Sequence, residues 1–479
     1  MTGHSEEEAT SQSMKEGREK RVSFPPDEQM VSDFVERRAE LQEDIILAYK
    51  QSCEKHHVKP NPKALDQLKQ ITCVTDRARC FDLSGEKLDY CSCESLEEIL
   101  KSVQFDFISL QGAELEENGA SSLLDMFLYY ESATHLDVSS NSGMGFSGWL
   151  SLSHLLRQSG CLWRLDACNM PMVDYAAQAL SKALLTSRLT VLHLENTCLS
   201  GKPLFTLGMP STHHSLERHV DPFDILGPLG RPPHSSQRDA QLLIIAIDRL
   251  SYMTSFVVAL CQSSSAHIPR TRTKHLGALK RNVALQELYL CENNLNGYQD
   301  SMQLGDLLKY NSTLKTLDLS NNTMCDSGLE EICDALSSQK TGLRTLILSN
   351  NHITHLGMSH LQNILPRLKT LETLNLGKNI LENRGIHTLK ESLMINRSLL
   401  QLGLASTGIT CEGAVTLAEI LAESPQIQRL DVRQNQVLAG GLMALALALK
   451  INRSLIRLDL DQHLKEEKVS CQLYPILII

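Results

Sequence analysis

The sequence is poor in aromatic residues and has no pair of CxxC motifs of the kind that hold zinc. Aromatic residues make up 5% of the 479 residues, so the core has to be built mostly from leucine. The fourteen cysteines are spread along the chain, which indicates thiols in a reducing compartment rather than a disulfide framework. Cys91 and Cys93, with Cys73 and Cys80 nearby, match no zinc spacing. We therefore expect no metal site and no cofactor.

Excess positive charge and an N-terminal apolar run are also missing. The net charge is -10, whereas a general nucleic-acid-binding protein needs a basic stripe to displace counterions from phosphates. The first twenty residues, MTGHSEEEATSQSMKEGREK, lack the apolar run of a secretory signal. We expect a cytoplasmic or nuclear protein that is not secreted and binds neither nucleic acid nor membrane.

Leucines recur at a fixed period. TLKTLDLSNNTMCDSGLEEICDAL from Thr313 and GLRTLILSNNHITHLGMSHLQNIL from Gly342 share the pattern LxxLxLxxNxL followed by Gly, which is the leucine-rich repeat. The first consensus positions are 28 or 29 residues apart, and they are Leu285, Leu314, Leu343, Leu371, Leu399, Ile427 and Leu455. Upstream, the same frame holds more loosely from about Ala78.

Each repeat combines two hydrophobic periods, an alternation that predicts a short strand and a spacing that predicts a helix. The fold class is therefore α/β, a leucine-rich-repeat solenoid over 78–207 and 276–461. Repeats of this length resemble the ribonuclease-inhibitor class of horseshoe, which implies strong curvature. An asparagine follows the first leucine by eight residues, and we expect its amide to pair backbone groups at a turn. These asparagines are Asn293, Asn322, Asn351, Asn379 and Asn435.

Three further segments lie at the ends of the array or before it. Residues 1–40 are too polar to fold and predict a disordered tail. In 41–77, Glu43 to Lys55 and Ala64 to Ile71 have helical spacing, which predicts a helical cap over the first repeat. Residues 462–479 do not continue the repeat, and we interpret them as an alternative or truncated ending, with a capping strand through Leu473 to Ile479 as the other interpretation.

One repeat contains an insert, 208–275. Leu189 and Leu285 are 96 residues apart, and removing Gly208 to His275 restores the period. Segments such as GPLGRPPHSS are typical of a loop or of disorder, and translated non-coding sequence is an equal interpretation. The apolar stretch AQLLIIAIDRLSYMTSFVVALC has Asp248 and Arg249 near its centre, which argues against a membrane span.

The tail contains a compact basic and apolar motif, KRVSF, at 20–24. It matches the RVxF motif by which many regulatory subunits bind the catalytic subunit of protein phosphatase 1. In an extended segment Val22 and Phe24 point to the same side, where they would fill two apolar pockets while the backbone joins a sheet edge. Lys20 and Arg21 would meet acidic residues at the rim and improve capture.

Two features accompany this motif. Met30 and Val31 match the paired hydrophobic site that often follows it. Ser23 lies between the two anchors and follows a basic pair, so we expect a phosphorylation site for a basophilic kinase. A phosphate adds about -1.5 to -2 charges and would weaken docking on an acidic rim. The alternative is a solvated basic patch with a kinase site.

Several segments together resemble a family of leucine-rich-repeat regulatory subunits of protein phosphatase 1. They are KRVSF, GEKLDYCSCESLEEIL, YYESATHLDVSSN, VLHLENTCLSGKPL, LNGYQDSMQLGDLLKYN and LGLASTGITCEGAV. The resemblance covers about residues 19 to 461 apart from the insert. It implies a non-catalytic subunit that binds the phosphatase and inhibits it. No set of nucleophile, base and oxyanion donors indicates an enzyme.

The alternative function is that of a scaffold that binds another protein by its concave face. The residue four places after the first consensus position is often acidic, which would suit a second, basic protein partner. These residues are Asp82, Asp137, Asp166, Asp318, Asp431 and Asp459, interrupted by His193, Tyr289 and Asn375. A family of GTPase-activating horseshoes also has repeats near this length, and stimulated GTP hydrolysis would distinguish it.

Overall fold

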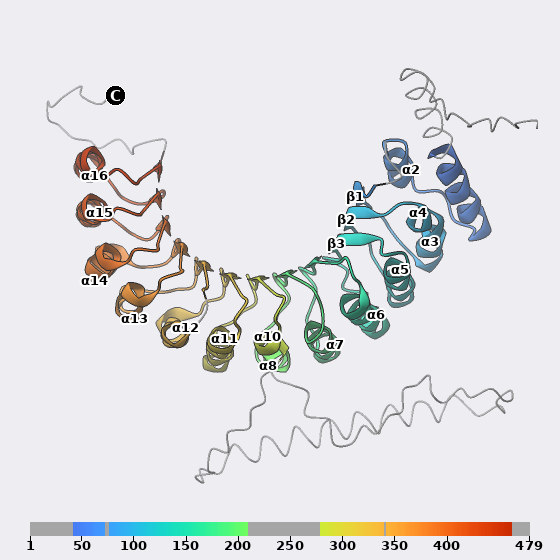
Figure 1. The fold of residues 1–479 in the computed structure, drawn as a ribbon, viewed down its shortest axis with the longest axis horizontal. Coiled ribbons are helices and arrows are strands. Elements are labelled where there is room, and N and C mark those ends of the chain that lie inside the picture. The colour runs from blue at the N-terminus through green and yellow to red at the C-terminus, as the bar shows by residue number, and fades with distance from the viewer. Residues whose placement is uncertain (1–41, 72–75, 209–277, 340–341, 462–479) are drawn as a thin grey trace, which may run out of the picture.

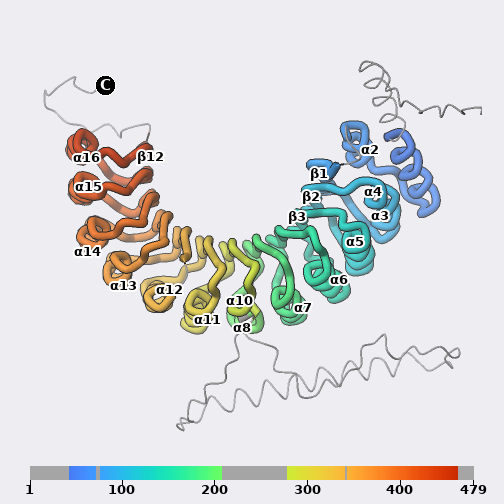
Figure 2. Tube along the Cα trace, viewed as in Figure 1, coloured from blue at the N-terminus to red at the C-terminus, as the bar shows by residue number. Residues whose placement is uncertain are grey.

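The repeats stack into one continuous curved array. The computed structural model describes residues 42–71, 76–208, 278–339 and 342–461. In these ranges twelve strands form one sheet in which each strand lies beside the next in chain order, and helices lie along the outer side (Figure 1). The Cα trace shows the same horseshoe, with the sheet on the inner curve (Figure 2). The predicted leucine-rich-repeat solenoid is confirmed.

The strands are short, parallel and in register. Each buried strand leucine lies beside its equivalent in the next repeat, as Leu317 beside Leu346. The strands are β1 (Ala78–Asp82), β2 (Phe105–Ser109), β3 (Ala133–Asp137), β4 (Arg164–Asp166), β5 (Val191–His193), β6 (Glu287–Tyr289), β7 (Thr316–Asp318), β8 (Thr345–Ile347), β9 (Thr373–Asn375), β10 (Gln401–Gly403), β11 (Arg429–Asp431) and β12 (Arg457–Asp459).

The helices force the array to curve. Packed helices lie about 8–10 Å apart, whereas neighbouring strands lie about 4.8 Å apart, so the helical side is the longer one. A 3-10 turn, η1 (Leu365–Arg367), follows α13. The helices are α2 (Pro62–Leu68), α3 (Tyr90–Ser95), α4 (Glu97–Ser102), α5 (Glu117–Tyr130), α6 (Gly145–Gln158), α7 (Asp174–Leu184), α8 (Lys202–Gly208), α10 (Ala278–Arg281), α11 (Tyr298–Tyr310), α12 (Cys325–Ser338), α13 (Met358–Ile364), α14 (Glu382–Ile395), α15 (Cys411–Glu423) and α16 (Ala439–Ile451).

Buried asparagines join neighbouring repeats. The side-chain amide of Asn322 donates to the carbonyl oxygens of Leu290 at 2.8 Å and Leu319 at 2.9 Å. Its side-chain oxygen accepts from the backbone N–H of Asn293 at 2.8 Å. The amide thus satisfies backbone groups that the turn after the strand would leave buried and unpaired. This is the structural role expected from the sequence.

The N-terminal end of the array is covered by helical residues 42–55 and by α2. Asn61 caps α2, because its side chain accepts from the N–H of Ala64 at 3.0 Å. The same side chain donates to Glu86 at 2.8 Å, which ties the cap to the first repeat. Residues 1–40, 462–479 and, apart from Gly208, the insert 208–275 lie outside the described residues.

The array continues across the insert without a change of register. β5 pairs in parallel with β6, with Leu192 beside Leu288. The amide of Asn293 reaches back across the same junction and donates to the carbonyl of Leu194 at 2.7 Å. The helix pieces α8 and α10, which flank the insert, contact each other. One repeat has therefore been split within its helix.

We expect a chain that lacks Gly208–His275 to fold with an unchanged or higher melting temperature. The β5–β6 pairing does not involve the insert, and the cost of closing a loop rises only slowly with its length. Calorimetry on the full chain and on the chain without Gly208–His275 measures the two melting temperatures. A fall in the melting temperature of more than about 5 °C corresponds to a loss of more than roughly 1 kcal/mol in the free energy of unfolding for a chain of this size. Such a fall would mean that the insert packs into the core.

Candidate functional site

Two rows of side chains line the concave face. They flank the buried strand leucine on either side, because successive strand residues point to opposite faces. The register brings the predicted Asp137, Asp166, Asp318 and Asp431 into one row. The complete row is Asp82, Ser109, Asp137, Asp166, His193, Tyr289, Asp318, Ile347, Asn375, Gly403, Asp431 and Asp459.

Asp166 is the centre of a charged cluster in β3 to β5. Its carboxylate lies 2.6 Å from Nε2 of His135 and accepts from Nε of Arg164 at 3.1 Å. Nδ1 of His193 is 3.5 Å away. Burial would raise the pKa of Asp166, but the hydrogen bonds from His135 and Arg164 and the nearby histidine charges hold that pKa below its usual range. With 12% of its side chain exposed, Asp166 serves the internal cluster more than a partner.

An aromatic strip extends from β2 to β6, across the strands of this cluster. The ring of Phe107 stacks on that of His135 with centroids 4.2 Å apart, and Trp163, which is 43% exposed, lies 6.2 Å beyond His135. The rings of His193 and Tyr289 are 4.0 Å apart. Tryptophan and tyrosine are enriched where protein interfaces concentrate their energy. The strip contains five rings at three consensus positions. From the sequence we noted His193 and Tyr289 only as interruptions of the acidic column, and Phe107, His135 and Trp163 were not singled out.

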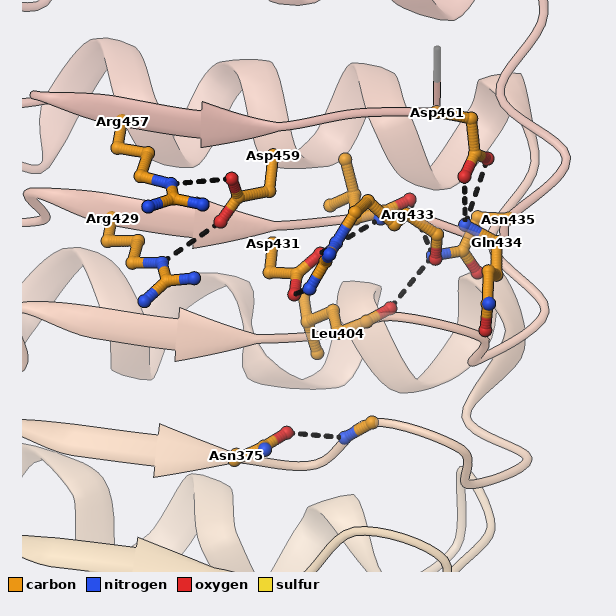
Figure 3. A network of polar contacts seen from close by, with 12 residues as sticks. Asn375, Leu404, Arg429, Asp431, Arg433, Gln434, Asn435, Arg457, Asp459 and Asp461 are labelled. Atoms are coloured by element: carbon orange, nitrogen blue, oxygen red, sulfur yellow. Dashed lines mark hydrogen bonds and ion pairs between the residues drawn. The ribbon is translucent and has the colours of Figure 1, made fainter. Parts of the chain in front are cut away.

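Arginines neutralise the row in the last repeats (Figure 3). Asp459 accepts from Nε of Arg429 at 2.9 Å and from Nε of Arg457 at 2.6 Å. Asp431 accepts from Arg433 at 2.9 and 2.6 Å. Burial would raise the pKa of Asp431, yet the hydrogen bonds from Arg433 lower it. These carboxylates are therefore already paired with cations.

Of the three remaining predicted carboxylates, Asp82 forms an ion pair with Lys63 at 3.0 Å, whereas Asp137 and Asp318 have neutral partners. Asp137 accepts from the N–H of Ser139 at 2.9 Å, and Asp318 accepts from the N–H of Ser320 at 2.9 Å. Among the residues that the structure describes, no ion pair involves either of them. Asp137 and Asp318 thus lie on the concave face beside the aromatic strip with their negative charge uncompensated.

The described residues contain no group of three or more His, Cys, Asp or Glu placed to hold a metal ion. None of the described helices is both long and apolar enough to cross a membrane. A hollow of about 1030 Å³ lies on the outer side between α3 and α6, where Glu94, Asp125 and Tyr129 line it. The predicted docking residues, Lys20 to Phe24 with Met30 and Val31, lie outside the described residues.

Comparisons with known proteins identify the repeats and their relatives. Two models described as "Leucine Rich repeat" and "Leucine Rich Repeat" match residues 310–333 and 342–364. Protein phosphatase 1 regulatory subunit 37 of Bos taurus is 45% identical over 361 residues, which cover 74% of this chain and 42% of the relative. The chain is a leucine-rich-repeat protein similar to protein phosphatase 1 regulatory subunit 37.

More distant relatives agree with this result. The Caenorhabditis elegans homolog of regulatory subunit 37 is 30% identical over 364 residues, which cover 72% of this chain and 31% of the relative. Ribonuclease inhibitor of Sus scrofa is 42% identical over 59 residues, which cover 12% of this chain and 13% of that protein. This chain spans about two fifths of the length of the bovine relative.

The Asp166 cluster should make the fold sensitive to acid through His193. Burial lowers the pKa of His193 below its ordinary value of 6.5, so the unfolded chain binds this proton more readily than the folded chain. The free energy of unfolding then falls as pH drops through 6.5 toward the folded pKa. We expect His193→Phe, which keeps a ring beside Tyr289, to lose less stability than the parent between about pH 7.5 and 5.5.

Urea unfolding at both pH values measures this difference. His154→Phe is the matched control, because His154 is exposed on α6, and its pH dependence should equal that of the parent. The same pH dependence in His193→Phe and in the parent would contradict the assignment.

Proposed function

We propose that this chain is a regulatory subunit of protein phosphatase 1, which docks on the catalytic subunit through Lys20 to Phe24 and inhibits its activity. The observation that carries the proposal is the similarity over 361 residues to a protein named as a phosphatase 1 regulatory subunit. The KRVSF motif supplies independent support, because it has two basic residues before Val22 and a serine between Val22 and Phe24.

In this proposal the tail provides the binding energy, and the horseshoe sterically obstructs the catalytic subunit. Val22 and Phe24 act as apolar anchors, the basic pair aids capture, and Met30 and Val31 extend the bound strand. Phe24 is eighteen residues before the first described helical residue, Gln42, and a chain of that length spans at most about 60 Å. The horseshoe would therefore stay beside the catalytic subunit, where it can obstruct the approach of protein substrates.

A second protein on the concave face is a further candidate partner. The aromatic strip and the uncompensated charges of Asp137 and Asp318 favour a partner that presents apolar and basic side chains together. Asp166 and Asp431 are engaged in internal contacts and would contribute less. Both roles are non-enzymatic, as for the relatives, which are named as regulatory subunits.

Val22→Ala/Phe24→Ala should abolish most binding to the catalytic subunit. Each anchor is worth roughly 2 kcal/mol or more when truncated, so the loss of both should raise the dissociation constant by about a thousandfold. Titration calorimetry against the purified catalytic subunit, with circular dichroism to verify the fold, measures the effect.

The tail offers a matched control for that experiment. Phe34→Ala/Val35→Ala removes the same two residue types from the same tail but outside the motif, and it should bind like the parent. Undiminished binding by the motif variant, or an equal loss in both variants, would count against docking through KRVSF.

A further inference from the structure

The C-terminal end of the horseshoe carries an apolar surface that no described residue covers. We define this surface as the end face: the exposed sides of α16 and β12. Met443 is 65%, Leu447 53%, Ile451 66% and Ile456 81% exposed. Within the described residues no helix or strand follows β12, so one edge of that strand has no neighbour in the sheet. Figure 2 shows α16 and β12 as the last turn of the array.

The exposed side of α16 is more apolar than the exposed side of α15, which lies one repeat earlier. Four positions of α15 are exposed: Val415, which is already apolar, and three carboxylates, Glu412, Glu419 and Glu423. Met443 is the equivalent of Val415 on α16, and the residues 28 places after the three carboxylates are Gly440, Leu447 and Ile451. The solvent-facing carboxylates of α15 are therefore replaced by apolar side chains and a glycine on α16.

The side of α16 that faces away from α15 is apolar as well. Leu421 of α15 is 1% exposed, whereas its equivalent in α16, Leu449, is 38% exposed. Directly after β11, Val432 is 3% exposed, whereas its equivalent after β12, Leu460, is 36% exposed. The last repeat thus presents side chains of the kind that earlier repeats bury against a following repeat.

A solenoid end normally needs a cap with a polar outer surface, since stacking leaves the last core open. The N-terminal end has such a cap in residues 42–55 and α2, with Tyr49 only 2% exposed. The end face has apolar residues on two sides and a free strand edge, which is an aggregation hazard if it stays uncovered. Some segment or molecule of matching apolar character is therefore required.

We propose that residues 473–479, LYPILII, cover the end face in the same chain. This run consists of apolar residues, one tyrosine and one proline, and none of its side chains is charged. It begins twelve residues after Asp461, the last described residue, and twelve extended residues reach about 40 Å. That reach exceeds the length of α16, which has 13 residues and so measures about 20 Å.

The intervening residues fit the same arrangement. Residues 464–468, LKEEK, carry four charges and suit a solvated connection. Pro475 has no backbone N–H, so it fits an extended segment on a sheet edge better than a helix. The end face then becomes an internal contact, and the chain stays monomeric. This inference does not depend on phosphatase docking.

A photo-crosslinking amino acid at position 477 of the full chain tests the occupant directly. We expect cross-links within a single chain to peptides from 439–460, recovered from the monomer fraction after size exclusion. Cross-links between two chains would assign the end face to a second copy and overturn the proposal. Cross-links elsewhere, or none, would overturn it too.

Hydrogen exchange supplies a second test with a charge-matched control. Ile476→Asp/Ile478→Asp should speed amide exchange in α16 and β12 by about tenfold or more, because an uncovered terminal repeat frays. Ser470→Asp/Gln472→Asp adds the same two charges but leaves LYPILII intact, and its exchange should match the parent. Equal exchange in the parent and the Ile476→Asp/Ile478→Asp variant would contradict the covering role.

Discussion

The asparagine that follows many of the strands makes the interaction on which the remaining structure depends. The amide of Asn351 donates to the carbonyl of Leu319 at 2.8 Å, and its oxygen accepts from the N–H of Asn322 at 3.2 Å and of Met324 at 3.2 Å. Each unpaired buried group would cost about 1–3 kcal/mol. This pairing requires one asparagine at the same place in successive repeats, so it fixes the register and hence the two rows on the concave face. Where the sequence has Thr407, its hydroxyl donates to the carbonyl of Leu404 at 2.8 Å instead.

Charge is distributed unevenly along the surface that this register creates. In the last repeats arginines pair with the acidic row, and in β3 to β5 histidines and Arg164 surround Asp166. Asp137 lies on β3 beside Asp166, and Asp318 lies on β7 between the two charged regions. The aromatic strip extends from Phe107 to Tyr289. Under the proposed function, the partner on the concave face and the phosphatase at the tail would use separate surfaces of the chain.

The repeat period predicted the fold because each consensus residue packs against its equivalent in the neighbouring repeat. Leu317 beside Leu346 is a contact that a spacing of 29 residues already implies. Which of the carboxylates have cationic partners was not predictable from the repeat period. Asp166 and Asp318 share one consensus position, yet only Asp166 has His135 and Arg164 within reach, because those partners come from the neighbouring row. The exposure of Met443 and Leu447 also required the structure, since their spacing matches that of a buried helix.

The proposed function assigns docking to the tail and makes the horseshoe its scaffold. The most direct measurement is the affinity of a synthetic peptide of residues 15–35 for the phosphatase 1 catalytic subunit, compared with that of the full chain. The peptide is expected to bind within about tenfold of the full chain, a difference of about 1.4 kcal/mol, and to compete with it for one site. A peptide that fails to bind or to compete, while the full chain binds tightly, would contradict the account.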